Sequence, residues 1–120
     1  MMDEGQAVAA FAALGQAHRL RIVRRLVTAG PEGLAAGLLA EAVGVSATNL
    51  SFHLKELSRA GLVTAQREGR SIRYRAAYPD LSALIQFLMR DCCQGHPDVC
   101  APALSALDAC RILTDDERHR

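Results

Sequence analysis

Three cysteine thiols lie close together toward the end of the 120-residue chain. Cys92 and Cys93 are adjacent, and Cys100 follows after a short stretch that contains Gly95 and Pro97. Sulfur is the ligand that soft metal and metalloid ions prefer. Because Gly95 and Pro97 allow the chain to curl back on itself, the three thiols could converge on one such ion.

Other uses of the same cysteines stay open at this point. His96 could join the three thiols in a tetrahedral zinc site, although two adjacent cysteines are not the usual ligand spacing for zinc. Cys92 or Cys93 could instead form a reversible disulfide with Cys100, which would make a redox switch. The cysteines could also lack any regulatory function. Cys110 has a helical spacing with apolar neighbours and is expected to be a small buried residue, although it could replace Cys100.

Composition and charge limit the classes of protein to which this chain can belong. The length suits one domain, and half of the residues are hydrophobic although tryptophan is absent. A core of leucine, valine, isoleucine and alanine favours packed helices over a β-sandwich. Positive charge is concentrated in residues 46–76, which hold six basic side chains and only two acidic ones. This segment has the charge expected of a nucleic-acid-binding surface, or of a solvated arginine-rich surface.

Neither secretion nor membrane insertion is predicted. No uninterrupted apolar run approaches the roughly 20 residues of a membrane-spanning helix. The acidic start at Asp3 and Glu4 lacks the basic opening of a secretory signal. We therefore expect a cytoplasmic protein with no membrane partner, in which the cysteines are reduced thiols rather than structural disulfides.

Helical periodicity predicts two helices in the first 30 residues. The first covers about Gln6–Leu14 and places Val8, Phe11 and Leu14 on one face. The second covers about His18–Thr28 and carries a broad apolar stripe. We interpret its arginines as a solvated surface rather than as readers of DNA: Arg19, Arg21, Arg24 and Arg25.

A helix-turn-helix is predicted between residues 34 and 60. Its first helix runs from Leu34 to Val43 and ends in a tight turn at Gly44, where a positive φ suits glycine. Ser46 has the chemistry of an N-cap, and the next helix is predicted over Ala47–Ala60. Each helix has one apolar face, formed by Leu34, Leu38, Leu39 and Val43 in the first and by Leu50, Leu54 and Leu57 in the second.

Beyond residue 62 the apolar period changes from that of a helix to that of a strand. Val63–Arg67 and Ser71–Ala76 are predicted to pair as a β-hairpin around Gly69. A last helix is predicted over Leu81–Cys92. Residues 103–113 could form a short helix, and residues 114–120 are expected to be disordered. The apolar stripe of the last helix comprises Leu81, Leu84, Ile85, Leu88 and Met89.

The helix pair followed by an arginine-rich hairpin predicts a mainly α fold with a β-hairpin wing, the winged helix-turn-helix. The second helix of such a pair fits the major groove of double-stranded DNA while the wing contacts the backbone or the minor groove. With the leucine seam turned inward, polar side chains point outward. The candidate DNA contacts are Thr48, Asn49 and Ser51 for base edges, Lys55 and Arg59 for phosphates, and Arg67, Arg70 and Arg73 on the wing.

Two further residues of the same helix have alternative roles. His53 lies at the edge of the outward face and is a candidate DNA contact, although a histidine here is more often a hydrogen-bonded structural residue. Phe52 either touches a thymine methyl group or packs beneath the wing, and we favour the packing role.

The first and last helices are more apolar than one small core requires. We therefore expect them to form a helical interface in a homodimer. A dimer also brings two reading helices to two half-sites, which a domain of this size needs for specific binding. We divide the chain into a DNA-binding and dimerisation domain, residues 1–93, and a C-terminal extension, residues 94–120, that completes the cysteine site.

Several segments together resemble one protein family. The run VSATNLSFHLKEL at 45–57, continued by AGLV at 60–63, resembles the recognition helix of the ArsR/SmtB family of metal-responsive repressors. AHRLRI at 17–22, REGR at 67–70 and the strand end Tyr74-Arg75 are similar to the same family, so the resemblance spans about residues 8–92. It implies a homodimeric repressor that binds operator DNA and leaves it when an inducer ion binds.

The resemblance also narrows the choice of inducer ion. Arsenic and cadmium sensors of the family carry a Cys-x-Cys box before the recognition helix, whereas residues 39–43 contain no cysteine. Its zinc sensors place acids and histidines along the last helix, whereas residues 81–90 contain neither. Cys92, Cys93 and Cys100 are similar to the site of an arsenic-responsive subgroup, and three thiolates complete the pyramidal coordination of As(III). The resemblance implies As(III), or Sb(III), as the inducer of an arsenical-resistance regulator with no organic cofactor.

An enzyme that handles arsenic through Cys92 and Cys93 is the alternative from a different class. The sequence contains no phosphate-cradling loop, no cofactor motif and no nucleophile with an evident base. We therefore expect a DNA-binding regulator rather than an enzyme. A thiol-redox response and a zinc response are the alternatives to As(III) within the same fold.

Overall fold

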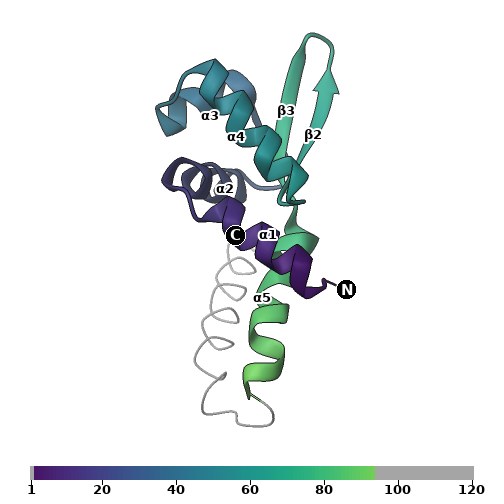
Figure 1. Ribbon diagram of the computed structural model, residues 1–120. Helices are drawn as coiled ribbons and strands as arrows, with labels where there is room; N and C mark the ends of the chain where they lie inside the picture. The colour runs from purple at the N-terminus through teal and green to yellow at the C-terminus, as the bar shows by residue number, and fades with distance from the viewer. Residues whose placement is uncertain (1, 94–120) are drawn as a thin grey trace. The chain divides into compact units, whose positions relative to one another are not determined.

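The computed structural model describes residues 2–93, with the side chains of residues 2–89. In this part of the chain, the contacts divide the molecule after Ile85, so that Gln86–Cys93 belong to a second unit. No helix within the described residues is long and apolar enough to cross a membrane. The elements are α1 (Glu4–Leu14), α2 (Ala17–Ala29), β1 (Leu34–Ala35), α3 (Ala36–Val43), α4 (Ala47–Arg59), β2 (Val63–Glu68), β3 (Ser71–Ala76) and α5 (Tyr78–Cys93) (Figure 1).

The winged helix-turn-helix prediction is confirmed. Helices α3 and α4 are joined by a turn in which Gly44 adopts a left-handed conformation, with a φ of 78°. Ser46 caps α4, because its side chain accepts a hydrogen bond from the backbone N–H of Asn49 at 3.2 Å. The leucine seam of α4 is buried at Leu50, Leu54 and Leu57. Local signals therefore predicted the start of α4 correctly.

The helix predicted from Leu34 begins two residues later, at Ala36. Leu34 and Ala35 instead form the short strand β1, which pairs antiparallel with β3 through Leu34–Tyr74 and Ala35–Arg73. The sheet has the order β1-β3-β2, so β3 is its central strand. The predicted buried face of this helix was partly wrong, because Leu39 is fully buried whereas Leu38 is 60 % exposed.

The wing is the hairpin β2–β3, closed by a turn in which Gly69 has a φ of 62°. Directly opposed residues of an antiparallel pair project from the same face of the sheet. Arg67 is opposed to Ile72, and Gln66 to Arg73. The wing arginines Arg67 and Arg73 therefore project from opposite faces, although the sequence analysis placed them in one group.

Helix α1 packs through its small residues. Ala7, Ala10 and Ala13 are buried, whereas Val8 is 62 % exposed and Phe11 is 43 % exposed. The helix also begins earlier than predicted, because the side chains of Asp3 and Gln6 form a capping box with each other's backbone N–H groups. The larger apolar side chains of α1 consequently remain on the surface.

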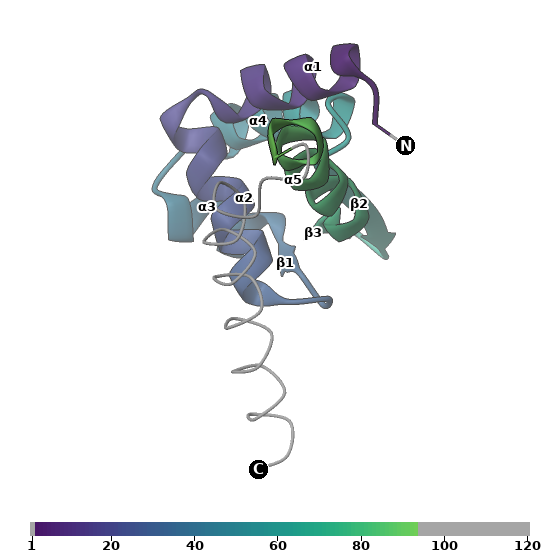
Figure 2. The same cartoon turned by 90° about the horizontal axis from the view of Figure 1, so that it is seen from below.

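Helix α4 lies between two groups of elements. It packs against α1, α2 and α3 as well as against β2. Figure 1 shows α1 and α2 below α4 and the β2–β3 hairpin to its right, and in Figure 2, seen from below, α1 lies in front of α4. The core that fixes this arrangement is apolar. Its largest fully buried side chains are Ile22, Leu26, Leu39, Leu50, Leu57 and Leu62.

Candidate nucleic-acid interface

The outward side of α4 is polar along its first two turns. Thr48, Asn49 and Ser51 are all exposed, and they follow directly after the Ser46 cap. The start of a helix carries a partial positive charge from its free backbone N–H groups, which favours an approaching phosphate. The structure thus brings together the three residues that were predicted to meet base edges.

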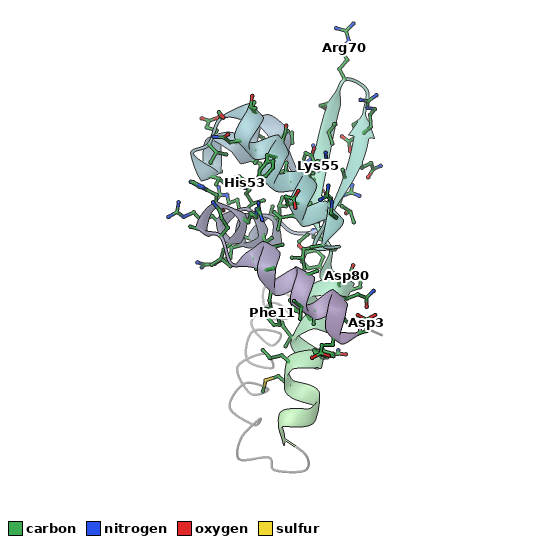
Figure 3. All side chains as sticks on the ribbon, viewed as in Figure 1. Asp3, Phe11, His53, Lys55, Arg70 and Asp80 are labelled. Atoms are coloured by element: carbon green, nitrogen blue, oxygen red, sulfur yellow. The ribbon has the colours of Figure 1, made fainter. Side chains whose placement is uncertain are left out.

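Farther along α4, Lys55 and Arg59 extend this exposed surface. Figure 3 shows Lys55 on the side of α4 nearest the hairpin. Arg59 forms an ion pair of 3.5 Å with Glu56 in the preceding turn. An exposed pair of this kind is weak, so Arg59 remains able to exchange Glu56 for a phosphate.

The three predicted wing arginines have different surroundings. Arg70 lies at the tip of the hairpin (Figure 3), and Arg67 is exposed on β2. Arg73 is partly buried, and its Nη1 donates hydrogen bonds to the backbone oxygens of Glu32 at 3.2 Å and Gly33 at 3.5 Å. Its Nε also lies 3.4 Å from a carboxylate oxygen of Glu68.

Arg73 therefore differs in role from the other two. Its contacts tie the wing to the loop before β1, across 41 residues of sequence in the case of Glu32. Arg67 and Arg70 form no ion pair among the described residues, so their charges are available to DNA. The structure favours Arg67 and Arg70 as the wing contacts and gives Arg73 a structural task.

His53 is not on the outward side of α4. Its residue exposure is only 9 %, and its Nδ1 accepts a hydrogen bond from Nε of Arg19 on α2 at 3.2 Å. Figure 3 shows His53 on the α2 side of α4. The DNA-contact role assigned to His53 is therefore wrong, because the ring is buried between two helices, and the structural alternative is what the molecule adopts.

Arg19 is not part of a solvated surface as its sequence pattern predicts, because it contacts two residues of α4. Besides binding His53, its guanidinium lies 5.6 Å from the centre of the Phe52 ring, within the range of a cation–π contact. Phe52 remains 57 % exposed, so the prediction that it packs beneath the wing is wrong. Arg19 precedes the buried residues Ile22 and Leu26 by three and seven positions, which is the spacing of one helix face. That spacing was the available signal.

The environment of His53 disfavours its charged form. Burial of the ring lowers the pKa of His53 from its usual 6.5, and the positive charge of Arg19 and then the ring of His18 lower it further. The centres of the two histidine rings are 5.6 Å apart. The Arg19 hydrogen bond requires an unprotonated Nδ1 on His53, so protonation of that nitrogen would also break this hydrogen bond between α2 and α4.

This predicts a specific loss of stability in mild acid. The unfolded chain binds a proton at His53 near pH 6.5, whereas the folded chain resists protonation to lower pH. The free energy of unfolding should therefore fall as the pH decreases from 6.5 through the lowered folded-state pKa. Urea unfolding across this window should show the slope in the wild type and its reduction in His53→Gln.

Phe52→Leu is a suitable control for this measurement. It changes the neighbouring side chain without removing a titratable group, so it should retain the pH slope of the wild type. Equal slopes in the wild type and His53→Gln would contradict the assignment.

The predicted thiol site reaches the end of the described chain. The backbone of Cys92 and Cys93 forms the end of α5. Cys100, His96 and the predicted extension 94–120 lie outside the described residues, as does Cys110. Among the described residues, no group of three His, Cys, Asp or Glu side chains that could hold a metal ion was found. The metal-binding assignments therefore stay predictions.

Comparison with known proteins identifies related sequences. A family described as "Helix-turn-helix domain" matches residues 14–66. The HTH-type transcriptional regulator Rv0081 of Mycobacterium tuberculosis is 37 % identical over 62 % of this chain and 64 % of its own length. The chain thus spans less than two thirds of that relative. The transcriptional activator HlyU of Vibrio cholerae is 30 % identical over 78 % of this chain and 84 % of its own length.

Solved structures extend the same relationship. An ArsR-like transcriptional regulator from Rhodococcus sp. RHA1 matches with a TM-score of 0.66 and 30 % identity, over 85 % of this chain and 93 % of that one. The homodimeric winged helix-turn-helix domain of Mb0332 from Mycobacterium bovis matches with a TM-score of 0.59 and 33 % identity, over 77 % and 85 %. Fold, exposed reading helix and sequence identity agree, and the chain belongs to the ArsR-like family of winged helix-turn-helix transcriptional regulators.

Proposed function

We propose that this protein is a homodimeric transcriptional repressor that binds operator DNA and leaves it when As(III) binds its C-terminal cysteines. The observation that carries the DNA-binding part is the exposed polar start of α4 beside a basic wing. The exposed side chains of Thr48, Asn49 and Ser51 would meet base edges, and the exposed Arg67 and Arg70 would meet the backbone alongside.

Exposed apolar side chains support the dimer. Val8 and Phe11 on α1 and Ile85 on α5 are each more than 40 % exposed. Clusters of large apolar residues on a surface often mark a protein interface. A two-fold axis through such a surface would present two copies of α4 to two half-sites of DNA. The homodimeric state of the Mb0332 domain supports the same assignment.

The proposal that As(III) is the inducer rests on the chemistry of the three cysteine ligands. Cys92, Cys93 and Cys100 supply three thiolates, which suit the three bonds of As(III) or Sb(III). Cys92 and Cys93 end the same helix that carries Ile85 of the proposed interface. Binding at the end of α5 could therefore alter how two protomers pack and change the spacing of their reading helices.

Induction then follows from a difference in affinity. The ion must bind the conformation that cannot hold DNA more tightly than the one that can. A complete switch from a bound to a free operator requires a large preference for one state, on the order of 10⁴-fold. Bonds from all three thiols to arsenic, formed in only one of the two conformations, would supply that preference.

The test uses a DNA duplex that the protein itself selects from a random-sequence pool. We expect Cys92→Ser and Cys93→Ser to bind that duplex as the wild type does but to remain bound when arsenite is added. Cys110→Ser is the matched control and should be released normally. Normal release of both Cys92→Ser and Cys93→Ser, measured by gel shift, would reject the arsenite site.

A redox response is the second candidate for the signal. One solved structure of the HlyU relative is of the reduced protein, and two nearby thiols can form a reversible disulfide. Parallel gel shifts with peroxide and with Zn(II) separate these candidates from arsenite. The HlyU relative is an activator, so a promoter assay decides whether the bound protein represses or activates.

A further inference from the structure

Phe52 is a large apolar side chain on the polar, exposed side of α4. It follows Thr48 by four positions and precedes Lys55 by three, and both of these residues are exposed. Residues at these spacings share one face of a helix. The buried side of α4 is formed by Leu50 and Leu54 instead. Phe52, which is 57 % exposed, therefore belongs to the surface that is proposed to enter the major groove.

Two neighbours hold the Phe52 ring. The guanidinium carbon of Arg19 lies over the ring, 5.6 Å from its centre. The ring of His53 meets it edge to face, with centres 5.9 Å apart and planes inclined at 66°. Arg19 and His53 are themselves joined by the 3.2 Å hydrogen bond between α2 and α4. The ring is thus supported on one side, while more than half of the residue stays open to solvent.

The surroundings of Phe52 indicate what the ring could contact. Single apolar residues are common on protein surfaces and by themselves indicate no partner. Phe52 differs because it lies among residues proposed to meet DNA, where binding removes water from the ring. Most groups on the base edges of the major groove are hydrogen-bond donors or acceptors, and the apolar one is the C5 methyl group of thymine. Removal of water is therefore favourable opposite a thymine and costly opposite unpaired polar groups.

We propose that Phe52 reads a thymine of the operator through contact between its ring and the C5 methyl group. The proposal rests on the DNA-binding function proposed above and adds to it the identity of one base. Arg19 is a positioning residue, because it holds the ring and no DNA contact is assigned to it. A ring that is already held loses less side-chain freedom on binding than a free one.

The test removes the methyl group from the DNA. Uracil pairs with adenine as thymine does but lacks the C5 methyl group. Each thymine of the self-selected duplex is therefore replaced by uracil in turn, in both half-sites together. We expect one such replacement to weaken binding about 4-fold per half-site and about 15-fold in all, as the loss of one buried methyl group requires.

The matching change in the protein removes the ring. Phe52→Ala should bind the thymine and uracil duplexes equally, so that the ratio of their affinities falls to about 1 at that position. Leu38→Ala is the control, because it removes another apolar side chain, 60 % exposed on α3, and should retain the ratio of the wild type. Since Phe52 is largely exposed, Phe52→Ala should melt close to the wild type.

Arg19→Met tests the positioning role. Methionine keeps the length of the side chain but has neither the charge nor the N–H donor, so the Phe52 ring loses its support. The ratio of thymine to uracil affinity should fall in this variant. A general loss of stability would weaken binding to both duplexes alike and leave the ratio unchanged. A ratio equal to that of the wild type would therefore reject the positioning role of Arg19.

Failure of the inference is distinct from failure of the proposed function. A wild-type protein that selects no duplex from the random-sequence pool would reject the proposed function. A wild-type protein that binds its selected duplex, with equal affinity after uracil replacement at every position, would reject the thymine contact alone. A uracil effect that persists in Phe52→Ala would assign the methyl contact to another side chain, such as Thr48, and would reject the role of Phe52.

Discussion

Gly33→Ala is expected to destabilise the protein by about 3 kcal/mol or more. Gly33 has a φ of 68°, a conformation that side chains disfavour. A Cβ atom there would meet the carbonyl oxygen of Tyr74 far inside contact distance, and would lie 2.9 Å from the Tyr74 carbonyl carbon and 2.8 Å from Cγ of Arg75. Because Tyr74 is on the central strand β3, its backbone cannot move without disturbing the sheet.

Gly44→Ala is the matched control for this substitution. Gly44 also has a positive φ, of 78°, but a Cβ atom there would meet nothing within 4 Å. Its replacement should cost only the backbone strain, about 1–2 kcal/mol. Urea unfolding of both variants measures the difference. Similar losses of unfolding free energy in the two variants would show that the close approach of Gly33 to β3 is unimportant.

Thr48→Glu is expected to weaken DNA binding about 100-fold, or about 2.7 kcal/mol, while leaving the fold intact. Thr48 is exposed in the first turn of α4, where the reading helix is proposed to enter the major groove. The change removes a hydroxyl contact and directs a negative charge at the phosphates. In the free protein the same charge lies at the positive end of α4, so thermal stability should hold or rise slightly.

This variant is informative because its DNA affinity is expected to fall while its thermal stability is expected to hold or rise. Ala17→Glu, at the exposed start of α2, places the same charge at another helix start and serves as the control. Its affinity for a self-selected duplex should change about 3-fold or less. Affinity is measured by fluorescence anisotropy, alongside a thermal melt. An unchanged affinity of Thr48→Glu would contradict the assignment of the DNA-reading surface to the start of α4.

Elements with strong local signals were predictable from the sequence. The seam Leu50, Leu54 and Leu57, together with the Ser46 cap, gave α4 as Ala47–Ala60, and the helix ends at Arg59. Periodicity, a cap and a stop near Gly61 all act within a few residues. The wing was predictable for the same reason, since its two strands are joined by one short turn.

Contacts between distant segments were not predictable in this way. Strand β1 is two residues long, so it has no period, and Leu34 pairs with Tyr74 forty positions later. In α1 the pattern places Val8 and Phe11 on one face, but the sequence did not indicate that Ala7, Ala10 and Ala13 are the residues that pack against the other helices. The thiol site stays a prediction, because Cys100 lies outside the described residues.

The bond between Arg19 and His53 is an intermediate case. His53 follows Leu50 by three positions and precedes Leu57 by four, so the edge of the leucine seam already includes it. Arg19 likewise shares a face with Ile22 and Leu26. What the sequence could not show is that these two edges meet, since that depends on how α2 crosses α4.

The ties of Arg73 and β1 to the wing affect how quickly the protein can engage a duplex. A wing that is already ordered in the free protein adds no loss of conformational entropy on binding, whereas each side chain immobilised at an interface costs about 0.5–1.5 kcal/mol. Encounter is then governed by diffusion and by attraction between the arginines and the duplex, which weakens as ionic strength rises. After the protein has dissociated from its operator, rebinding would therefore not be slowed by the folding of a wing loop.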